Sequence, residues 1–235
     1  MNPTAGRILS LNVGGPRTVV WNGRPVVTSI WKHPVTGRRA VSATNVEGDR
    51  QSDLRVHGGP DKAVYVYAAE DLDWWRGQLG RALPHGVFGE NLTVETPHPL
   101  GDSLLGDRWA IGSTLFEVSQ PRLPCHKLGI RMGDMGFIRR FVHARRFGLY
   151  LRVIRPGEIG AGDTIAVVDR PAHRVSVDLV ARTFLVDRSR AGELLAAPQL
   201  PESWRDWVRE QVATPATLSA GAIRTAQSNR DAPVI

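Results

Sequence analysis

Residues 17–32 read RTVVWNGRPVVTSIWK, in which two runs rich in β-branched residues flank the dipeptide Asn22-Gly23. Asn and Gly tolerate the positive φ angles that a two-residue hairpin turn requires. The pattern therefore predicts that residues 17–32 pair as two antiparallel strands. A hairpin this well defined favours a fold built mainly from strands.

Further short strands are predicted along the first two thirds of the chain. Each is a run of apolar, β-branched or aromatic residues bounded by Gly or Pro turns. These runs are residues 7–13, 39–46, 63–68, 91–95, 114–120, 149–154 and 163–168. So many short strands separated by turns predict a closed or nearly closed antiparallel β-barrel, in a fold of the α+β class that is mainly β.

Two helices interrupt the strands. In residues 69–83, Leu72, Trp75 and Leu79 recur at three- and four-residue spacing, and residues 134–147 repeat this pattern. Both helices should lie against the barrel. After residue 171 the sequence has the pattern of three short helices, with Ser176 and Ser189 as N-caps of the first two. The chain is thus expected to form a barrel domain, a three-helix domain and a loose tail, at residues 1–171, 172–215 and 216–235.

The only cysteine in the 235 residues is Cys125. One thiol can form no internal disulfide, and it cannot supply the paired thiolates of a structural zinc site. The N-terminal residues lack the apolar core of a secretory signal, and no run approaches the length of a membrane span. We therefore expect a cytoplasmic protein that does not cross a membrane.

The chain carries 30 Lys and Arg against 23 Asp and Glu, a formal charge of +7. Binding to duplex nucleic acid is disfavoured, because no helix-turn-helix, zinc-finger or aromatic ribonucleoprotein signature accompanies the scattered arginines. A small anionic ligand, such as a phosphate-bearing cofactor, needs only a few converging cations and fits the charge equally well.

Two segments of the barrel carry residues suited to chemistry. In the first, Glu47, Asp49 and His57 precede the Gly58-Gly59 loop, whose glycines let backbone N–H groups approach a ligand. The alternative is an ordinary turn before a buried strand. In the second, Asn91 offers both a donor and an acceptor to a ligand, or merely closes a turn.

A third segment, residues 118–131, surrounds the single thiol. Pro121 and Pro124 hold the approach to Cys125 extended. Three basic side chains flank it, those of Arg122, His126 and Lys127. If a helix begins at Cys125, its positive N-terminal end and these cations favour a thiolate, which can act as a nucleophile or a soft metal ligand. The alternative is a buried cysteine acting as a small hydrophobe.

Four motifs carry a resemblance to a known family. They are EGDRQSDLRVHGGPDKAVYVY, FGENL, GDRWAIG and VSQPRLPCHKL. Their order and spacing resemble those of MOSC-domain proteins, and the helices after residue 172 resemble the C-terminal three-α domain of the YiiM-like branch. The resemblance covers about residues 5–215.

The resemblance implies a barrel that holds molybdenum cofactor, with Cys125 as protein ligand to the metal. It further implies reduction of N-hydroxylated compounds, including toxic hydroxylaminopurine base analogues, to amines. In this interpretation Glu47 or His57 delivers a proton to the departing oxygen. The cofactor and its phosphate would be held by Lys32, Asp49, Gly58, Gly59, Asn91, Arg122 and Lys127, among which Arg122 is favoured over Lys32 for the phosphate because it lies three residues from the thiol.

Electrons must then come from outside the chain. No GxGxxG fingerprint follows a strand, and one cysteine cannot hold an iron–sulfur cluster, so a separate reductase is expected. The three-helix domain could dock that reductase, or could be a stabilising cap or a homodimerisation unit. The competing interpretation is a cofactor carrier or sulfur-transfer module without its own substrate. Pyridoxal phosphate on Lys32, Lys62 or Lys127 is disfavoured, because none lies in the large-domain context of such enzymes.

Overall fold

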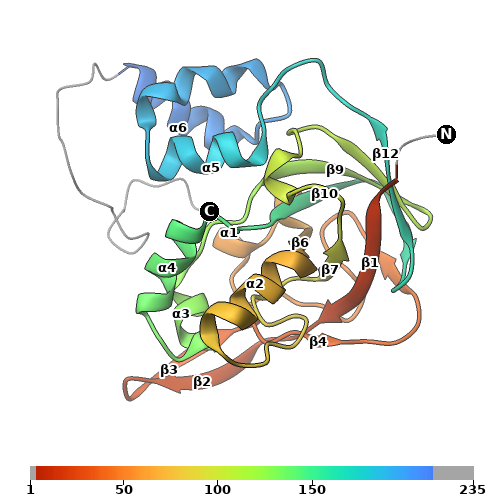
Figure 1. The fold of residues 1–235 in the computed structure, drawn as a ribbon, viewed down its shortest axis with the longest axis vertical. Helices are drawn as coiled ribbons and strands as arrows, with labels where there is room; N and C mark the ends of the chain where they lie inside the picture. Colours follow the sequence, from red (N-terminus) through yellow and green to blue (C-terminus); the bar gives the residue numbers. More distant parts are fainter. Residues whose placement is uncertain (1–3, 214–235) are drawn as a thin grey trace.

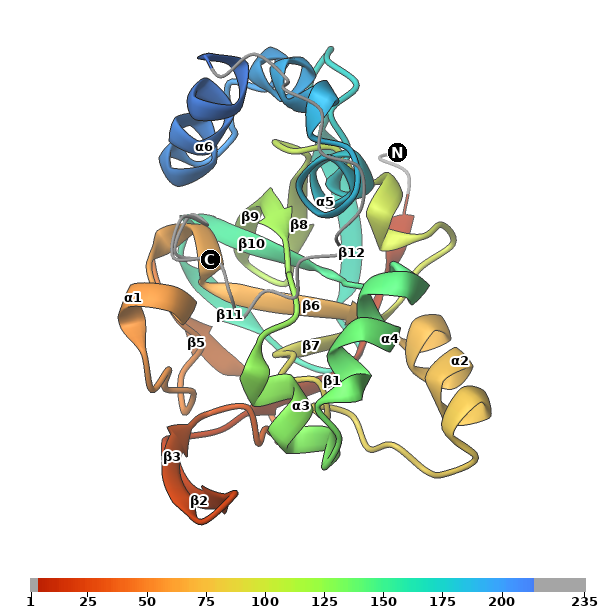
Figure 2. The same ribbon diagram turned by 90° about the vertical axis from the view of Figure 1, so that its left-hand side faces the viewer.

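The computed structural model describes residues 4–213 of the chain. Seven strands form a closed β-barrel in the order β12-β8-β9-β10-β6-β7-β1, which the pairing of β12 with β1 closes. The barrel strands are β1 (Thr4–Val13), β6 (Val64–Ala68), β7 (Leu92–Glu95), β8 (Arg108–Ile111), β9 (Thr114–Pro121), β10 (Leu149–Arg155) and β12 (Thr164–Asp169). The predicted mainly-β fold of the α+β class is confirmed, with helices around the barrel (Figures 1 and 2).

One pair of barrel strands departs from the antiparallel arrangement predicted for the whole barrel. Strands β6 and β7 run parallel, with Val66 opposite Leu92, so the barrel is mixed. A parallel pair requires a long crossover, and helix α2 (Ala69–Leu79) lies within it. The sequence showed the helix but did not reveal that it connects two parallel neighbours.

Shorter elements complete the β structure. Strand β4 (His33–Pro34) extends the barrel sheet beside β1, while β5 (Arg39–Val41) pairs with β11 (Gly157–Ile159). The predicted strand at 39–46 is therefore shorter than expected, with Val46 joined to Val41 only by an isolated bridge. Strand β8 was not predicted, since its four residues carry little β-branched character.

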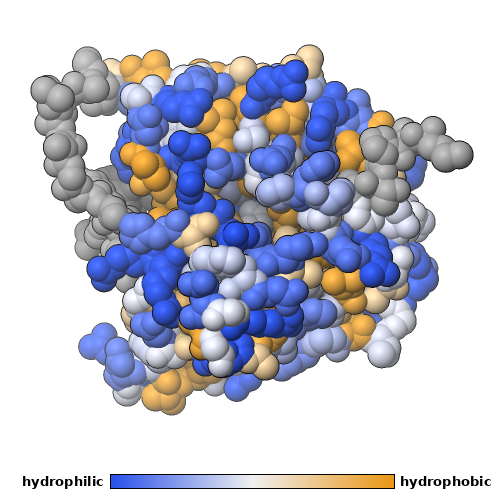
Figure 3. Space-filling model, viewed as in Figure 1, coloured by the Kyte–Doolittle hydropathy of each residue, from blue (hydrophilic) through white to orange (hydrophobic). Residues whose placement is uncertain are grey.

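The predicted hairpin is confirmed as β2 (Arg17–Trp21) paired with β3 (Arg24–Thr28). Asn22 and Gly23 have φ angles of 49° and 74°, so both turn residues adopt the left-handed conformation. The hairpin forms its own two-stranded sheet and projects from the body at the lower left of Figure 1. In the same view, Figure 3 shows hydrophobic surface exposed over this projection.

Helices α2 and α4 (Gly136–Ala144) lie against the barrel, as predicted. Trp75 of α2 stacks on Phe141 of α4 with ring centroids 5.7 Å apart, and both contact Phe88. Offset and edge-to-face aromatic pairs of this kind add to the burial of large apolar surfaces. The two helices are thus joined through one aromatic core.

Between these helices in sequence, the 3-10 helix η2 (Leu100–Asp102) precedes the barrel strand β8.

A helical unit follows β12 and consists of α5 (Val177–Leu185), the 3-10 helix η3 (Arg188–Ala196) and α6 (Glu202–Ala213). Ser176 caps α5 as predicted, accepting from the Leu179 N–H at 3.1 Å. The prediction for Ser189 is wrong, because Ser189 lies inside η3. The N-cap of η3 is Asp187, whose carboxylate accepts from the Ser189 N–H. The predicted tail, residues 216–235, lies outside the described residues.

The indole N–H of Trp204 on α6 donates to the amide oxygen of Gln120 on β9 at 2.5 Å, which fixes the helical unit to the barrel. Trp204 also packs between Phe184 and Trp207, with ring centroids 5.2 and 5.9 Å away. Across residues 4–213, no helix has the length and apolar character needed to span a bilayer.

Candidate active site around Cys125

A pocket opens on the side of the barrel where Cys125 lies, and it encloses about 540 Å³ of space that is partly open to solvent. Helix α1 (Leu54–His57), the 3-10 helix η1 (Pro60–Lys62), helix α3 (His126–Met132) and the segment after β3 surround it. Its lining residues are Thr28, Ser29, Ile30, Lys32, Arg50, Gln51, Ser52, His57, Lys62, Tyr65, Phe88, Gly89, Asn91, Arg122, Cys125, Lys127 and Tyr150.

Cys125 directly precedes α3, so the condition considered from the sequence, a helix that begins at this residue, is met. Its backbone is extended, with φ −124° and ψ 169°, and its carbonyl accepts the first helical hydrogen bond from Leu128 at 2.9 Å. Strand β9 ends at Pro121, and Pro124 precedes the thiol. The two prolines and the helix start therefore fix the Cys125 side chain at a corner of the pocket.

The pKa of the Cys125 thiol is lowered to about 5. Burial alone raises this pKa, but a hydrogen bond from His57 and the positive charge of Arg122 outweigh burial. Cys125 is therefore a thiolate at neutral pH, the form that acts as nucleophile or metal ligand. The alternative of an inert, buried thiol does not fit this surrounding.

Arg122 is only 4% exposed and lies above the ring of Tyr65, with its guanidinium carbon 5.4 Å from the ring centroid. Its Nη1 is buried without a hydrogen-bond partner among the described residues. Tyr150, which hydrogen-bonds Arg122, has its pKa raised to about 12 by burial. A buried guanidinium with an unused donor, on a residue that lines this pocket, is suited to an anionic ligand.

Five basic side chains line the pocket: Lys32, Arg50, Lys62, Arg122 and Lys127. We call them the basic cluster. No Asp or Glu is among the residues lining this pocket. Only three of the chain's 30 basic residues are lysines, and all three belong to the basic cluster. Lysine carries its charge on a compact ammonium group, and arginine is not an equivalent replacement. The confinement of lysine to this pocket is therefore a feature of the site.

The lysines have different surroundings. Lys32 Nζ forms an ion pair with Asp49 Oδ2 at 2.7 Å, and Asp49 Oδ1 accepts from the Gly14 N–H at 2.9 Å. Burial lowers the pKa of Lys62 to about 8, and the nearby Asp61 carboxylate opposes this shift. Lys127 Nζ lies 3.4 Å from Ser52 Oγ. Asp49 does not line the pocket, and its contribution is to hold the ammonium group of Lys32 in place from behind the pocket wall.

The structure brings six of the predicted residues to the pocket lining, namely Lys32, His57, Asn91, Arg122, Cys125 and Lys127. Asn91 accepts from the Tyr65 N–H at 3.1 Å and donates to the Asn12 carbonyl at 3.3 Å, so its amide also joins strands. Gly58 and Gly59 are not among the lining residues, although Gly59 has φ 90° and precedes η1.

Glu47 lies outside the pocket. It is exposed, and its carboxylate accepts from the Ala40 N–H at 3.3 Å. Of the two residues predicted as proton donors, His57 lines the pocket and Glu47 does not. Glu47 lies in a turn ahead of α1 and His57 is the last residue of α1, so their closeness in sequence does not bring both side chains to the pocket.

Sequence reasoning did not assign site roles to Lys62, Tyr65, Tyr150 and Arg50. Tyr65 and Tyr150 lie on the paired strands β6 and β10, with ring centroids 5.4 Å apart. The rarity of lysine was a signal that could have identified Lys62. No local pattern distinguishes the two tyrosines from ordinary core residues, because their neighbours along β6 and at the start of β10 are also buried.

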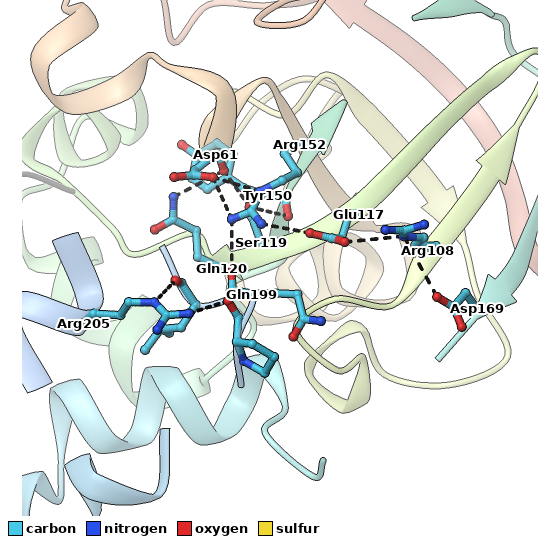
Figure 4. Close-up of polar contacts among 12 residues, drawn as sticks. Asp61, Arg108, Glu117, Ser119, Gln120, Tyr150, Arg152, Asp169, Gln199 and Arg205 are labelled. Atoms are coloured by element: carbon cyan, nitrogen blue, oxygen red, sulfur yellow. Dashed lines mark hydrogen bonds and ion pairs between the residues drawn. The ribbon is translucent and has the colours of Figure 1, made fainter. Parts of the chain in front are cut away.

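A polar network supports one wall of the pocket from outside (Figure 4). Arg152 Nη1 donates to Glu117 Oε1 at 2.8 Å and Arg152 Nη2 donates to the Gln199 carbonyl at 3.1 Å. Ser119 Oγ donates to the Asp61 carbonyl at 2.6 Å. The loop before Lys62 is thereby held to the barrel and to the helical unit.

Comparison with known proteins gives several matches. A model of the MOSC domain matches residues 53–166. The chain is 35% identical over 201 residues to the uncharacterized protein YflK of Bacillus subtilis, which covers 84% of this chain and 90% of YflK. It is 30% identical over 189 residues to protein YiiM of Escherichia coli, covering 77% and 82%. A Gibberella moniliformis protein named Reductase is 32% identical over 203 residues, 85% of this chain but 36% of that protein.

Solved structures agree with these matches. The crystal structure of YiiM from Geobacillus stearothermophilus superposes with a TM-score of 0.73 at 30% identity, covering 88% of this chain and 99% of that one. The crystal structure of YiiM from Escherichia coli gives a TM-score of 0.66 at 24% identity, covering 87% and 95%, and supports the fold alone.

Proposed function

The chain belongs to the MOSC-domain family, and we propose that it is a molybdenum-cofactor-dependent oxidoreductase that reduces N-hydroxylated compounds to amines. The observation that carries the proposal is the Cys125 thiolate, which faces a pocket lined by the basic cluster and by no carboxylate. The fungal relative named Reductase supports a redox role. That relative is much longer, and this chain spans about a third of it.

The pocket fits the cofactor in three respects. The Cys125 thiolate is a soft donor suited to a metal already bound by sulfur. Arg122 has an unpartnered buried Nη1, which a phosphate oxygen would satisfy. Lys62, Lys127 and Arg50 supply further positive charge for that phosphate.

When bound, the cofactor supplies a centre that passes two electrons to the substrate, so that R–NHOH, two electrons and two protons give R–NH₂ and water. The chain's own residues would orient both partners. An aromatic wall against which a planar ring can pack is formed by Tyr65, Tyr150 and Phe88. His57, which hydrogen-bonds Cys125, is the side chain placed to hold and deliver a proton at the departing oxygen.

Two further expectations belong to this proposal. Electrons come from a separate reductase, because the single cysteine excludes a cysteine-held iron–sulfur cluster within the given chain. We place the protein in the cytoplasm, where a lone accessible thiol remains reduced.

The test begins with molybdenum content, measured by elemental mass spectrometry on protein made in a host that synthesises the cofactor. We expect near-stoichiometric metal in the parent and its loss in Cys125→Ala, with His126→Ala as the matched control that retains metal. Loaded protein reduced by dithionite should then convert N-hydroxycytosine and 6-hydroxylaminopurine to the amines. Loading without turnover would favour a cofactor carrier or sulfur-transfer module, and absence of metal from the parent would refute both.

A further inference from the structure

The positive charge of the chain is concentrated at one place in the sequence. Residues 1–46 contain six basic residues and no Asp or Glu, so they account for nearly the whole surplus of +7. Three of these six are neutralised by ion pairs, Arg7 with Glu95, Lys32 with Asp49 and Arg38 with Asp163. Among the described residues, Arg17 and Arg24 of the hairpin form no ion pair with a carboxylate.

The hairpin also exposes apolar side chains. The cross-strand pairs Thr18–Val27 and Val20–Pro25 share one face of the ribbon, because alternate residues of a strand point to the same side. Val20 is 73% exposed and Val27 is 52% exposed, and Figure 3 shows hydrophobic surface at this projection. The ribbon therefore presents a small apolar face, while Arg17 and Arg24 alternate to its other face, one at each end of the ribbon.

Further arginines extend the positive surface from the hairpin toward the body. The guanidinium carbons of Arg17 and Arg131 lie 4.9 and 5.2 Å from the ring centroid of Trp31. Burial lowers the pKa of Arg131, the charge of Glu90 opposes this shift, and the charges of Arg17 and Arg81 lower the pKa further. Three guanidinium groups are thus gathered at the base of the hairpin, beside the segment that enters the pocket.

This surface is continuous with the pocket wall. Strand β3 ends at Thr28, and Thr28, Ser29, Ile30 and Lys32 all line the pocket. A protein docked on the hairpin would therefore lie directly beside the site that receives electrons. Protein interfaces combine apolar contacts with polar and charged ones, and positive charge beside the contact speeds association with a negatively charged partner.

We propose that hairpin β2–β3, together with Arg81 and Arg131, is the docking surface for an acidic electron-transfer protein that reduces the site. This inference rests on the proposed function, and it names the chemistry of the partner and its place of contact.

The helical unit is a weaker candidate for the same role. Residues 172–213 contain six basic and six acidic residues. Four of its arginines are ion-paired with carboxylates of the same unit, Arg182, Arg190, Arg205 and Arg209. Such a neutral, internally paired surface offers little attraction to an acidic partner.

Other occupants of the hairpin fit less well. A second copy of this chain would bring like charges together, which is unfavourable. A nucleic acid requires a longer track of cations than the four arginines of this surface, and its phosphates gain nothing from the exposed valines. The acidic protein satisfies both the charge and the apolar face.

The test measures binding of cofactor-free protein to a [2Fe–2S] ferredoxin and to a flavodoxin, by biolayer interferometry at low and high salt. The variants Arg24→Glu and Val20→Asp should each weaken Kd about tenfold for the carrier that binds, and added salt should weaken the parent similarly. The control Arg155→Glu makes the same charge change on an exposed arginine, five residues beyond Tyr150 along β10, and should stay within about twofold of the parent.

Turnover by loaded protein provides a second readout. Arg24→Glu should slow carrier-driven reduction of N-hydroxycytosine and leave dithionite-driven reduction unchanged. The inference is overturned if neither carrier binds the parent at low salt, or if Arg24→Glu binds as tightly as the parent. It is also overturned if the hairpin variants instead lose binding to a single-stranded RNA or to phosphatidylserine vesicles, or if Val20→Asp dissociates a dimer. Carrier binding without any dithionite-driven turnover would refute the proposed reaction and leave the docking surface standing.

Discussion

Arg152 Nε donates to the Oδ1 of Asp61 at 2.8 Å, which joins two parts of the pocket from behind. Asp61 directly precedes Lys62 in η1, and Arg152 lies two residues beyond Tyr150 on β10. Arg152 also binds Glu117 and the Gln199 carbonyl, as Figure 4 shows. The positions of Lys62 and Tyr150 therefore depend on one guanidinium that does not itself line the pocket.

Replacing Arg152 should lower the stability of the folded protein. We expect Arg152→Met to lower the free energy of unfolding by about 3 kcal/mol, because the buried carboxylate of Glu117 loses its closest cation. Urea unfolding measures this change, and hydrogen exchange should show earlier opening of residues 58–62. Arg190→Met removes an exposed pair with Glu193 and should cost less than about 1 kcal/mol. Equal losses in the two variants would contradict the role assigned to Arg152.

The buried pair of Lys32 and Asp49 leads to a second prediction. Their side chains are 9% and 0% exposed, so Asp49→Asn leaves a buried ammonium without its counter-ion. The expected loss of unfolding free energy is about 3–5 kcal/mol, measured by urea titration at neutral pH. Arg7→Met, which breaks the exposed pair with Glu95, is the control and should change stability by less than about 1 kcal/mol. A loss below that of the control would show that Lys32 finds another partner.

The thiol should titrate far below its ordinary range. In cofactor-free protein, the rate of Cys125 alkylation by iodoacetamide should rise with pH around a midpoint of about 5. His57→Ala removes the hydrogen bond that favours the thiolate, so the midpoint should move upward. His126→Ala changes the neighbouring imidazole, which is exposed, and should leave the midpoint in place. A parent midpoint near that of a free thiol, about 8.5, would exclude a stabilised thiolate.

Lys62 offers a prediction at alkaline pH. Because burial lowers its pKa to about 8, its amine should become reactive about two pH units before an ordinary lysine. Acylation by acetic anhydride across pH 6 to 11, read by peptide mass spectrometry, measures the midpoint. Asp61→Asn should lower that midpoint further, since the carboxylate opposes the effect of burial. A midpoint above 10 would mean that the ammonium is fully solvated.

The sequence by itself determined much of the local structure. The dipeptide Asn22-Gly23 specified the hairpin, because its two residues accept the left-handed conformation that such a turn requires. Apolar spacing located α2 and α4, and the two prolines with the cations around Cys125 indicated both the helix start and the thiolate. The family resemblance identified the barrel. Apart from the resemblance, each of these signals lies within a few residues, where turn geometry and side-chain periodicity act directly.

The tertiary structure alone decided which distant residues meet. It made β6 and β7 parallel, placed Tyr65 beside Tyr150, and left Glu47 outside the pocket while His57 reached Cys125. It also tied Asp61 to Arg152 across 91 positions of sequence. The physical reason is that these contacts depend on the register in which strands pair around the closed barrel. Within a hairpin the turn sets the register, but which strands distant in sequence become neighbours depends on packing of the whole barrel, which no local run of residues records.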